Sequence, residues 1–444
     1  IPASIRDIQF IKSANKVVLF YQFQGNTTVY AAAAELNTEG QLVGKPKIID
    51  TAENVRPGSN AKVFNLLESD DHSQLKLFSV NTTKANSLKV KVVSLNSDFD
   101  ILNESTVNVN AQNKKSVLSD FALDNKGNLF CLRNMTLEGA APAVSLLYLS
   151  ADGLEVVESS ILNATLLLDD IRLKVENANG RVILNSFYAT TKKGNVEGIY
   201  SYIWDAKAKK EITSNASRFT DAIRKAVSSK RNLKDAYDNF YFDKINIQAD
   251  GSIVVVAEAA ETNSNRNIFS RWDYFYGGPF YNPFMFSFWN RPFGFYPWAR
   301  FGWGMSPFMW NPWMNPYAGF GYPSVMYNAN KIALIAIDTK GSIQWVKTID
   351  KKQSDMNVDQ FIGYGVLENN NATTFVYQKR EKGVSQFMVN SLGKDGLLSK
   401  GANVIVAEKN YEWIPRSLKQ TGDNEAIVPY QYKDRIGFAK IQIK

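Results

Sequence analysis

Few side chains of this chain could carry catalysis or hold a metal ion. The 444 residues include one histidine, His72, and one cysteine, Cys131. A Cys/His zinc cluster and an intramolecular disulfide each need more of these residues, and a Ser-His-Asp triad has only one imidazole to use. His72 stands in the polar stretch LESDDHSQ, so we expect it in solvent. Cys131 alternates with apolar neighbours, so we expect a half-buried strand residue.

Aspartates are the remaining candidates for acid–base chemistry. Asp120, Asp169, Asp170 and Asp359 stand near the expected starts of inner strands, where a glycosidase needs two or three facing carboxylates. Aspartates at such positions more often cap turns, and the sequence contains no P-loop and no G-x-S-x-G elbow. None of the Asp-rich turns continues to the ligand glutamate of a calcium loop. We therefore predict a protein without a catalytic, metal or cofactor site, with carbohydrate binding or glycan cleavage as the alternative.

The elements that would position these residues are short β-strands joined by recurring turns. Each turn places a glycine where a hairpin needs positive φ, with Asp, Asn or Glu just before it to bond the turn backbone. Strand-forming residues alternate with polar ones on both sides, as in residues 16–23 and 88–95. Turns of this kind occupy residues 37–42, 124–130, 150–157, 248–256, 338–346 and 393–398.

Alignment of these hairpins gives a repeat of about 50–60 residues and four strands, which is typical of a propeller blade. Seven units fit, and we predict an all-β propeller of seven four-stranded blades formed by residues 1–444. Six or eight blades, or two stacked all-β domains divided near residue 240, are the alternatives. The last unit ends after three strands, so we expect residues near the N-terminus to complete it. The inner strands are expected to start near Ile5, Ala61, Val117, Leu167, Phe242, Asp359 and Trp413.

A basic insertion is expected at residues 205–240. The net charge of +8 is modest for this length, and we predict no nucleic-acid binding. Thr220-Asp221 can cap a helix within the insertion. The helix gives either a solvated face or a patch for anionic lipids or an acidic partner. We expect Phe219, Ile223, Val227 and Leu233 to point inward and Arg224, Lys225, Lys230 and Arg231 outward.

A second insertion, residues 272–323, is strongly aromatic. It holds 22 of the 56 aromatic residues, six of the nine tryptophans and eight of the fourteen prolines, but only three charged residues. The prolines and glycines exclude a continuous helix or central strands. Burial of 22 such rings is worth about 80–110 kcal/mol gross, at about 25 cal/mol per Å² and about 150–250 Å² per ring. We expect the core of a propeller to have no room for them.

This aromatic segment therefore has three possible fates. It caps one face of the propeller, enters a membrane–water boundary, or forms the centre of an interface with a protein partner, where Trp, Tyr, Phe, Met and Arg are enriched. We predict the third, with an outer-membrane protein complex as partner and contact with the membrane surface as a further possibility. The expected anchors are Trp289, Phe293, Tyr296, Trp298, Trp303, Trp310 and Trp313.

One stretch resembles a known family. Residues 336–345, AIDTKGSIQW, are similar to the A-x-D-x-x-T-G-x-x-x-W signature of quinoprotein-type propeller repeats, although the threonine before glycine is lacking and the spacing is one residue shorter. The resemblance covers one blade, implies an inward-docked Trp345 and gives no support for a quinone cofactor. The Asn/Lys-rich strands also resemble exported propellers of Bacteroidota cell envelopes, in which Asp50-Thr51-Ala52 would match an O-glycosylation motif.

These features predict where the protein works. The opening residues IPASIRDIQF have neither the charged region nor the apolar region of a signal peptide, so we expect any such peptide to have been removed already. We predict an exported protein, periplasmic or at the cell surface and associated with the outer membrane. Its expected role is a non-enzymatic scaffold or subunit of an envelope complex.

Overall fold

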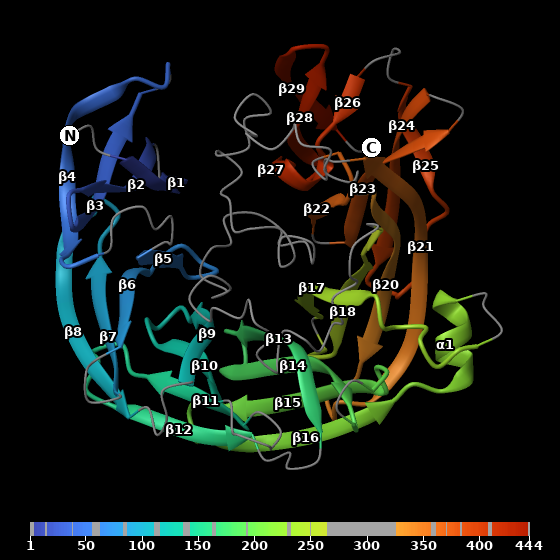
Figure 1. Ribbon diagram of the computed structural model, residues 1–444, viewed down its shortest axis with the longest axis horizontal. Coiled ribbons are helices and arrows are strands. Elements are labelled where there is room, and N and C mark those ends of the chain that lie inside the picture. The colour runs from blue at the N-terminus through green and yellow to red at the C-terminus, as the bar shows by residue number, and fades with distance from the viewer. Residues whose placement is uncertain are drawn as a thin grey trace.

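Seven antiparallel sheets follow one another around a ring and form a β-propeller (Figure 1). We call these sheets blades one to seven in chain order. The expected seven-bladed all-β architecture is confirmed, and the largest error for an inner strand is Tyr364 where Asp359 was expected. The computed structural model describes residues 4–13, 16–37, 39–55, 63–82, 87–110, 116–135, 143–161, 166–191, 194–228, 232–248, 250–263, 326–356, 361–369, 371–381, 384–406 and 411–442.

Each of the first four blades is built from four consecutive strands, with the first strand innermost in the ring. Blade one consists of β1 (Ser4–Ser13), β2 (Lys16–Gly25), β3 (Thr28–Leu36) and β4 (Leu42–Ala52). Blade two consists of β5 (Phe64–Glu68), β6 (Leu75–Thr82), β7 (Ser87–Leu95) and β8 (Ile101–Asn110). Blade three consists of β9 (Ser116–Leu123), β10 (Leu129–Met135), β11 (Ala143–Leu149) and β12 (Val156–Ile161). Blade four consists of β13 (Leu167–Glu176), β14 (Arg181–Ala189), β15 (Gly198–Asp205) and β16 (Lys210–Arg218).

The last three blades depart from this plan at two places. Blade five consists of β17 (Phe240–Ile247), β18 (Ile253–Ala259), β20 (Met326–Ile337) and β21 (Ile343–Met356), with the short β19 (Glu261–Asn263) beside β20. Blade six consists of β22 (Tyr364–Glu368), β23 (Ala372–Glu381), β24 (Val384–Gly393) and β25 (Ala402–Val406). Blade seven consists of β26 (Tyr411–Trp413), β27 (Lys419–Gly422), β28 (Glu425–Tyr432) and β29 (Arg435–Gln442). Its β26 and β27, separated by the 3-10 helix η6 (Pro415–Ser417), pair with different halves of β28.

The N-terminal strand does not complete blade seven, contrary to our expectation. β1 pairs with β2 over its whole length, from Ser4 opposite Gln24 to Ser13 opposite Lys16. A hairpin between neighbouring strands forms without closing a long loop, so its ordering cost is lower than that of pairing with a strand 400 residues away. Blades one and seven consequently lie on either side of an opening in the ring (Figure 1).

The core lies between the blades. Six clusters of buried apolar side chains join successive blades, from blades one and two to blades six and seven. The cluster between blades four and five contains Ile199 and Ile203 from one side of residue 240 and Val255 and Ile335 from the other. The chain is therefore packed continuously across residue 240, where the two-domain alternative placed a boundary.

The predicted turn chemistry is confirmed. All six predicted turn glycines have φ between 73° and 84°, which non-glycine residues rarely adopt. The preceding aspartates bond the turn backbone: Asp338 Oδ1 accepts from Lys340 N (2.9 Å) and Ser342 N (2.8 Å). The six glycines are Gly40, Gly127, Gly153, Gly251, Gly341 and Gly396.

These turns predict acid sensitivity. The Ser150 hydroxyl and the Leu154 N–H lower the pKa of Asp152, and the Ser252 hydroxyl and N–H do the same for Asp250. A depressed folded pKa adds stability above the ordinary carboxyl value of about 4, and this stability is lost as the pH falls through the folded pKa. We expect Asp152→Asn and Asp250→Asn together to flatten the fall in unfolding free energy between about pH 5 and about pH 2, measured by urea titration. An unchanged slope would contradict this assignment.

The basic insertion is shorter than residues 205–240. Residues 210–218 form β16, and the helix α1 (Asp221–Val227) has seven residues, with the Thr220 side chain accepting from Ile223 N as expected. Arg224 does not point outward. Its guanidinium is buried and donates to the carbonyls of Val196 (3.1 Å) and Lys234 (2.8 Å). These hydrogen bonds connect the helix to the loops beside it. Arginine at this place satisfies several carbonyls at once, because it carries five donors.

Candidate interaction site at the root of the aromatic segment

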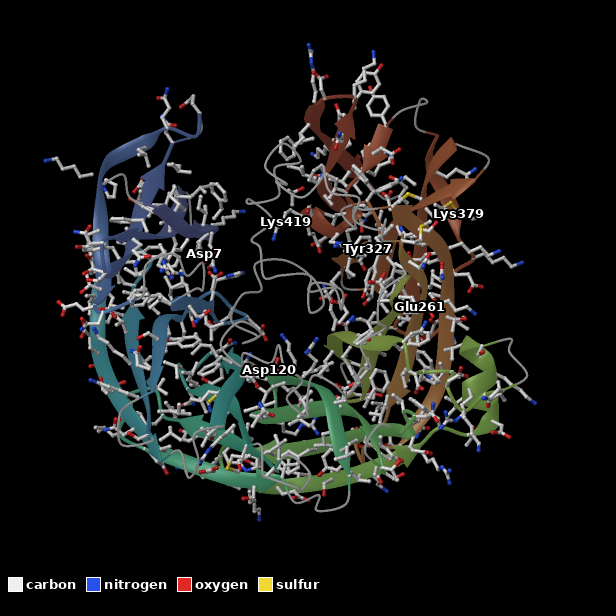
Figure 2. The ribbon with its side chains drawn as sticks, viewed as in Figure 1. Asp7, Asp120, Glu261, Tyr327, Lys379 and Lys419 are labelled. Atoms are coloured by element: carbon white, nitrogen blue, oxygen red, sulfur yellow. The ribbon has the colours of Figure 1, made fainter. Side chains whose placement is uncertain are left out.

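The aromatic segment leaves and returns through two paired strands. β19 runs antiparallel to the start of β20, with Glu261 opposite Asn328 and Asn263 opposite Met326. Glu261 and Tyr327, labelled in Figure 2, mark this root. The segment itself lies outside the described residues, and so do its expected anchors Trp289, Phe293, Tyr296, Trp298, Trp303, Trp310 and Trp313.

A buried ion pair lies beneath this root. The ammonium of Lys351, on β21, contacts Oε1 of Glu258, on β18, across the intervening strand β20. Lys351 is fully buried and Glu258 is 3% exposed. On β20 the register shifts between Ala329, which is fully buried and opposite Gln353, and Lys331, which is opposite Asp350, so Lys351 lies at this irregularity. The pair therefore ties the outer strand of blade five to its second strand.

Two further groups contact the ammonium of Lys351. This ammonium donates to Gln353 Oε1 (2.9 Å) and lies 5.3 Å from the centre of the Tyr364 ring, which adds a cation–π contact. The Tyr364 hydroxyl donates to Asp243 on β17. Burial raises the pKa of Glu258 and lowers the pKa of Lys351, because both charged forms lose hydration, and the contact between them opposes both shifts. Either group would be costly to bury without its partner.

Glutamine side chains join this cluster to the next blades. Gln353 Oε1 accepts from Gly363 N (2.8 Å), and its Nε2 donates to Gln378 O (2.6 Å) in blade six. Gln378 Oε1 in turn accepts from Trp413 N (2.7 Å) in blade seven. Gln22 makes the same kind of contact between blades one and two, accepting from Phe64 N (2.9 Å) and donating to Phe64 O (2.7 Å). A glutamine can bind both polar groups of one residue in this way, which fixes the position of the next inner strand.

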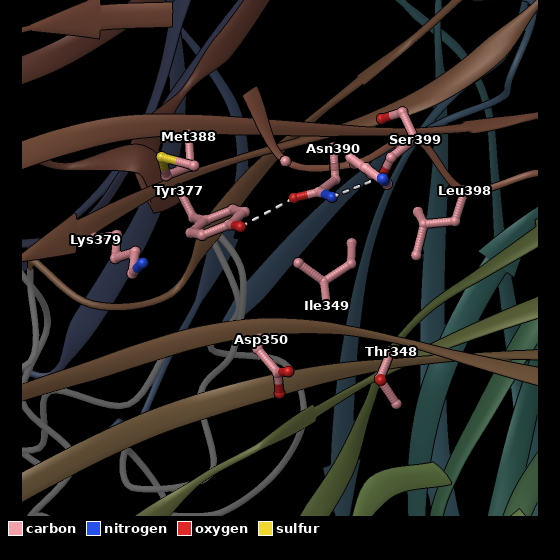
Figure 3. A pocket seen from close by; sticks show the side chains of 11 residues that line it. Thr348, Ile349, Asp350, Tyr377, Lys379, Met388, Asn390, Leu398 and Ser399 are labelled. Carbon is pink, nitrogen blue, oxygen red and sulfur yellow. Dashed lines mark hydrogen bonds between the residues drawn. The ribbon is translucent and has the colours of Figure 1, made fainter. Parts of the chain in front are cut away.

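A groove of about 340 Å³ opens between blades five and six, on the outer side of the same interface (Figure 3). Burial, with nearby Asp350, raises the pKa of Tyr377 to about 12, and the Tyr377 hydroxyl donates to Asn390 Oδ1 (2.9 Å). Lys379 and Lys400 also line the groove, and among its described lining residues Asp350 is the only carboxylate. The described lining of the groove therefore lacks the pair of carboxylates that a glycosidase uses.

Of the four candidate channel carboxylates, the structure describes the side chains of Asp120 and Asp169. Asp120 lies on the inner strand β9 at a bulge, with φ of 47°, and faces the middle of the ring together with Asp7 and Lys419 (Figure 2). Asp169 is fully buried, so it cannot contact a polysaccharide. Asp170 lies on β13, and Asp359 lies outside the described residues.

The single histidine and the single cysteine lie in different surroundings. His72 is exposed at a turn with φ of 60°, and its Nδ1 lies 2.8 Å from Glu68 Oε1, so the solvent position expected for it is confirmed. Cys131 is fully buried rather than half-buried, because both faces of β10 are covered by neighbouring blades. Burial raises the pKa of its thiol, which makes it a poor nucleophile.

Sequence reasoning missed Glu258 and Lys351. One signal was present for Glu258, since it is the single charged residue in the apolar run IVVVAEAA of β18. Lys351 stands in the ordinary polar stretch TIDKKQ, and nothing there distinguishes it from the exposed Lys352 beside it. Within the described ranges, no group of three His, Cys, Asp or Glu side chains is placed to hold a metal ion. No helix among these residues is long and apolar enough to span a bilayer.

No protein-family model and no curated protein matches the chain. Among solved structures, the β-propeller domain of the Trilobed protease from Pyrococcus furiosus is 9% identical, covering 99% of this chain and 97% of that chain with a TM-score of 0.38. The endo-arabinase from Bacteroides thetaiotaomicron is 11% identical over 58% of this chain and 89% of that chain, with a TM-score of 0.28. The α-L-arabinanase from Penicillium chrysogenum is 11% identical over 57% and 77%, with a TM-score of 0.33.

At identities of 11% or less, these similarities carry no conclusion about activity, ligand or partner. They also give no support to a quinoprotein-type repeat or to an origin in Bacteroidota. Trp345, which carries the quinoprotein-like resemblance, packs half-buried against the core between blades five and six. Its ring lies against Gly396 of the neighbouring blade, where a Cβ atom would come within 3.3 Å. A structural role in blade packing accounts for this tryptophan.

Proposed function

We propose that this protein is a non-enzymatic propeller scaffold that presents its aromatic segment to a protein partner. The observation that carries the proposal is the local composition of residues 272–323, which combine 22 aromatic residues with three charges. Depletion of charge together with enrichment of Trp, Tyr, Phe and Met is the composition of an interface centre. We further propose an exported protein, periplasmic or at the cell surface, whose partner is an outer-membrane complex.

The described structure supports this role in two ways. The inter-blade cores are filled by the blades' own side chains, including the fully buried Trp204, Phe187 and Phe242. The root of the segment rests on the buried pair of Glu258 and Lys351, whose contacts extend into blade six. A binding segment with a rigid base loses less conformational entropy on docking than one attached to a long free loop.

The alternatives remain distinguishable by experiment. A carbohydrate-binding or glycan-cleaving propeller would use the channel, where Asp120 and Asp7 lie, and would retard in gels containing polysaccharide. Docking to a membrane surface through the aromatic rings and the basic residues near α1 would show as flotation with anionic liposomes that decreases with salt. Neither behaviour is expected of a scaffold that binds a protein.

Deletion of residues 272–323 tests the proposal. The deletion leaves ten residues between Asn263 and Met326, which are already opposite each other, so the connection closes without strain. We expect the deletion variant to fold, with the far-ultraviolet circular dichroism spectrum of a β-sheet protein and a cooperative unfolding transition, and to lose every partner that the full chain captures from solubilised envelopes.

Two results would overturn it. Unfolding of the deletion variant would show that the segment covers its own ring. Retention of the same partners by a folded deletion variant would show that binding lies elsewhere on the propeller.

A further inference from the structure

One Asn-Gly pair occurs in the 444 residues, Asn179-Gly180. It lies in the turn that joins the inner strand β13 to β14 in blade four, and the Asn179 side chain is exposed there. The side-chain amide of an asparagine can be attacked by the backbone nitrogen of the next residue. Glycine hinders this attack least, because it has no side chain. The surroundings of the glycine nitrogen therefore determine whether such a pair reacts.

The nitrogen of Gly180 differs from those of the other turn glycines. Each of the six turn glycines with φ between 73° and 84° donates its N–H to the carbonyl three residues before it. Gly153 N, for example, donates to Ser150 O (2.9 Å), and Gly251 N donates to Gln248 O (2.9 Å). Gly180 also has a positive φ, 63°, but its N–H has no such acceptor among the described residues. This nitrogen is available to act as a nucleophile.

The space around Gly180 is open as well. A Cβ atom at this position would meet no atom within 4 Å beyond the two chain neighbours. A Cβ atom at Gly153 would instead collide with the Ser105 side chain, and one at Gly251 would come within 2.5 Å of Arg181 Nη2. Attack on the amide closes a five-membered ring from atoms of both residues, and the open side of Gly180 leaves room for that ring.

The amide that would be attacked is held within the same turn. Asn179 Nδ2 donates to Oε1 of Glu176 (2.7 Å), which is 6% exposed and contacts Nε of Arg181 through its other oxygen. A carboxylate in place of this amide would remove the donor and bring a second negative charge beside Glu176. Arg181 also packs against Gly251 of blade five, so the change would disturb the joint between blades four and five.

We propose that Asn179-Gly180 is a self-modification site, at which the folded chain converts an amide into a carboxylate. The Gly180 nitrogen loses its proton to solvent and bonds to Cγ of Asn179. The Cγ–Nδ2 bond then breaks, and ammonia leaves after taking up a proton. Water opens the resulting cyclic imide at either of its two carbonyl carbons, which gives aspartate or isoaspartate at position 179. Water is the one co-reactant, and nothing is oxidised or reduced.

Incubation of the full chain at mildly alkaline pH, followed by peptide mass spectrometry, tests this proposal. We expect Asn179 to be converted first among the asparagines, with isoaspartate among the products. The rate should rise with pH, because the attacking nitrogen must be deprotonated. Aspartate without isoaspartate would show direct hydrolysis of the amide, and earlier conversion of other asparagines would show that this turn gives no advantage. Either result, or an Asn179 that stays unmodified, overturns the proposal.

Two variants separate the structure of the turn from its sequence. Asp152→Asn creates a second Asn-Gly pair at Gly153, whose N–H is hydrogen-bonded and whose surroundings are crowded. We expect this pair to react several-fold more slowly than Asn179-Gly180 in the same chain, and equal rates would contradict the role of the free N–H. Asn179→Asp supplies the charge of the product directly. It is expected to lower the unfolding free energy in a urea titration, and an unchanged value would contradict the effect on the joint between blades four and five.

Discussion

Replacing Lys351 by methionine is expected to lower the unfolding free energy by about 3–5 kcal/mol, the usual cost of removing one partner of a buried ion pair. The substitution leaves Glu258 buried beside Tyr364 without its cation. Since burial already raises the pKa of Glu258, the orphaned carboxyl should take up a proton more readily. The loss of stability should therefore be largest near neutral pH and shrink as the pH falls toward the ordinary carboxyl pKa of about 4.3.

Two control variants separate this effect from ordinary charge loss. Lys331→Met removes a cation from the same blade that pairs with Asp350 at 3.3 Å near the surface, and such pairs contribute only about 0–1 kcal/mol. The double variant Glu258→Leu/Lys351→Met removes both charges and should regain most of the stability. Urea titration gives all three values. Equal effects of Lys351→Met and Lys331→Met would contradict the importance of the buried pair.

Serine at the seven proposed anchors is expected to abolish partner capture. The anchors are Trp289, Phe293, Tyr296, Trp298, Trp303, Trp310 and Trp313. Removal of one central aromatic side chain from an interface often costs 2 kcal/mol or more, so the loss of seven should reduce capture by on the order of a hundredfold or more. The fold should be retained, because the scaffold proposal places these side chains outside the propeller's own cores. Quantitative mass spectrometry of the captured proteins measures the effect.

The matched control is serine at Leu102 and Leu154, two exposed hydrophobic residues of the blades. We expect this variant to capture the same partners in the same amounts as the original chain. Equal capture by the seven-anchor variant and this control would remove the anchors from the binding surface. Equal loss in both would indicate nonspecific hydrophobic association.

The repeat and the turns were predictable because they depend on local chemistry. Glycines such as Gly341 and Gly396 are required by positive φ, and the aspartates before them bond the nearest N–H groups, so both signals lie within a few residues of one another. The alternation of apolar residues in β2 follows from its pleat. These local rules determine where the strands lie and how many blades they build.

The errors concern contacts between distant residues. Arg224 carries a charge typical of an exposed helix face, but its burial depends on carbonyls of residues 196 and 234 that only the folded chain brings near. The partnership of Glu258 and Lys351 spans 93 residues and a whole intervening strand. The one strand expected to be missing from the last repeat suggested exchange with the N-terminus, but the pairing of β1 with β2 decides otherwise.

The exposure of the segment tryptophans in the isolated protein tests the scaffold proposal most directly. Trp204 and Trp413 are buried and Trp345 is half-buried, whereas the other six tryptophans lie in residues 272–323. Acrylamide quenching of the fluorescence therefore reports mainly on the aromatic segment. We predict that most of the emission of the isolated chain is quenched, and that it becomes protected when the partner is bound. Emission that is shielded in the isolated monomer would show that the protein covers its own aromatic rings, and would contradict the proposal.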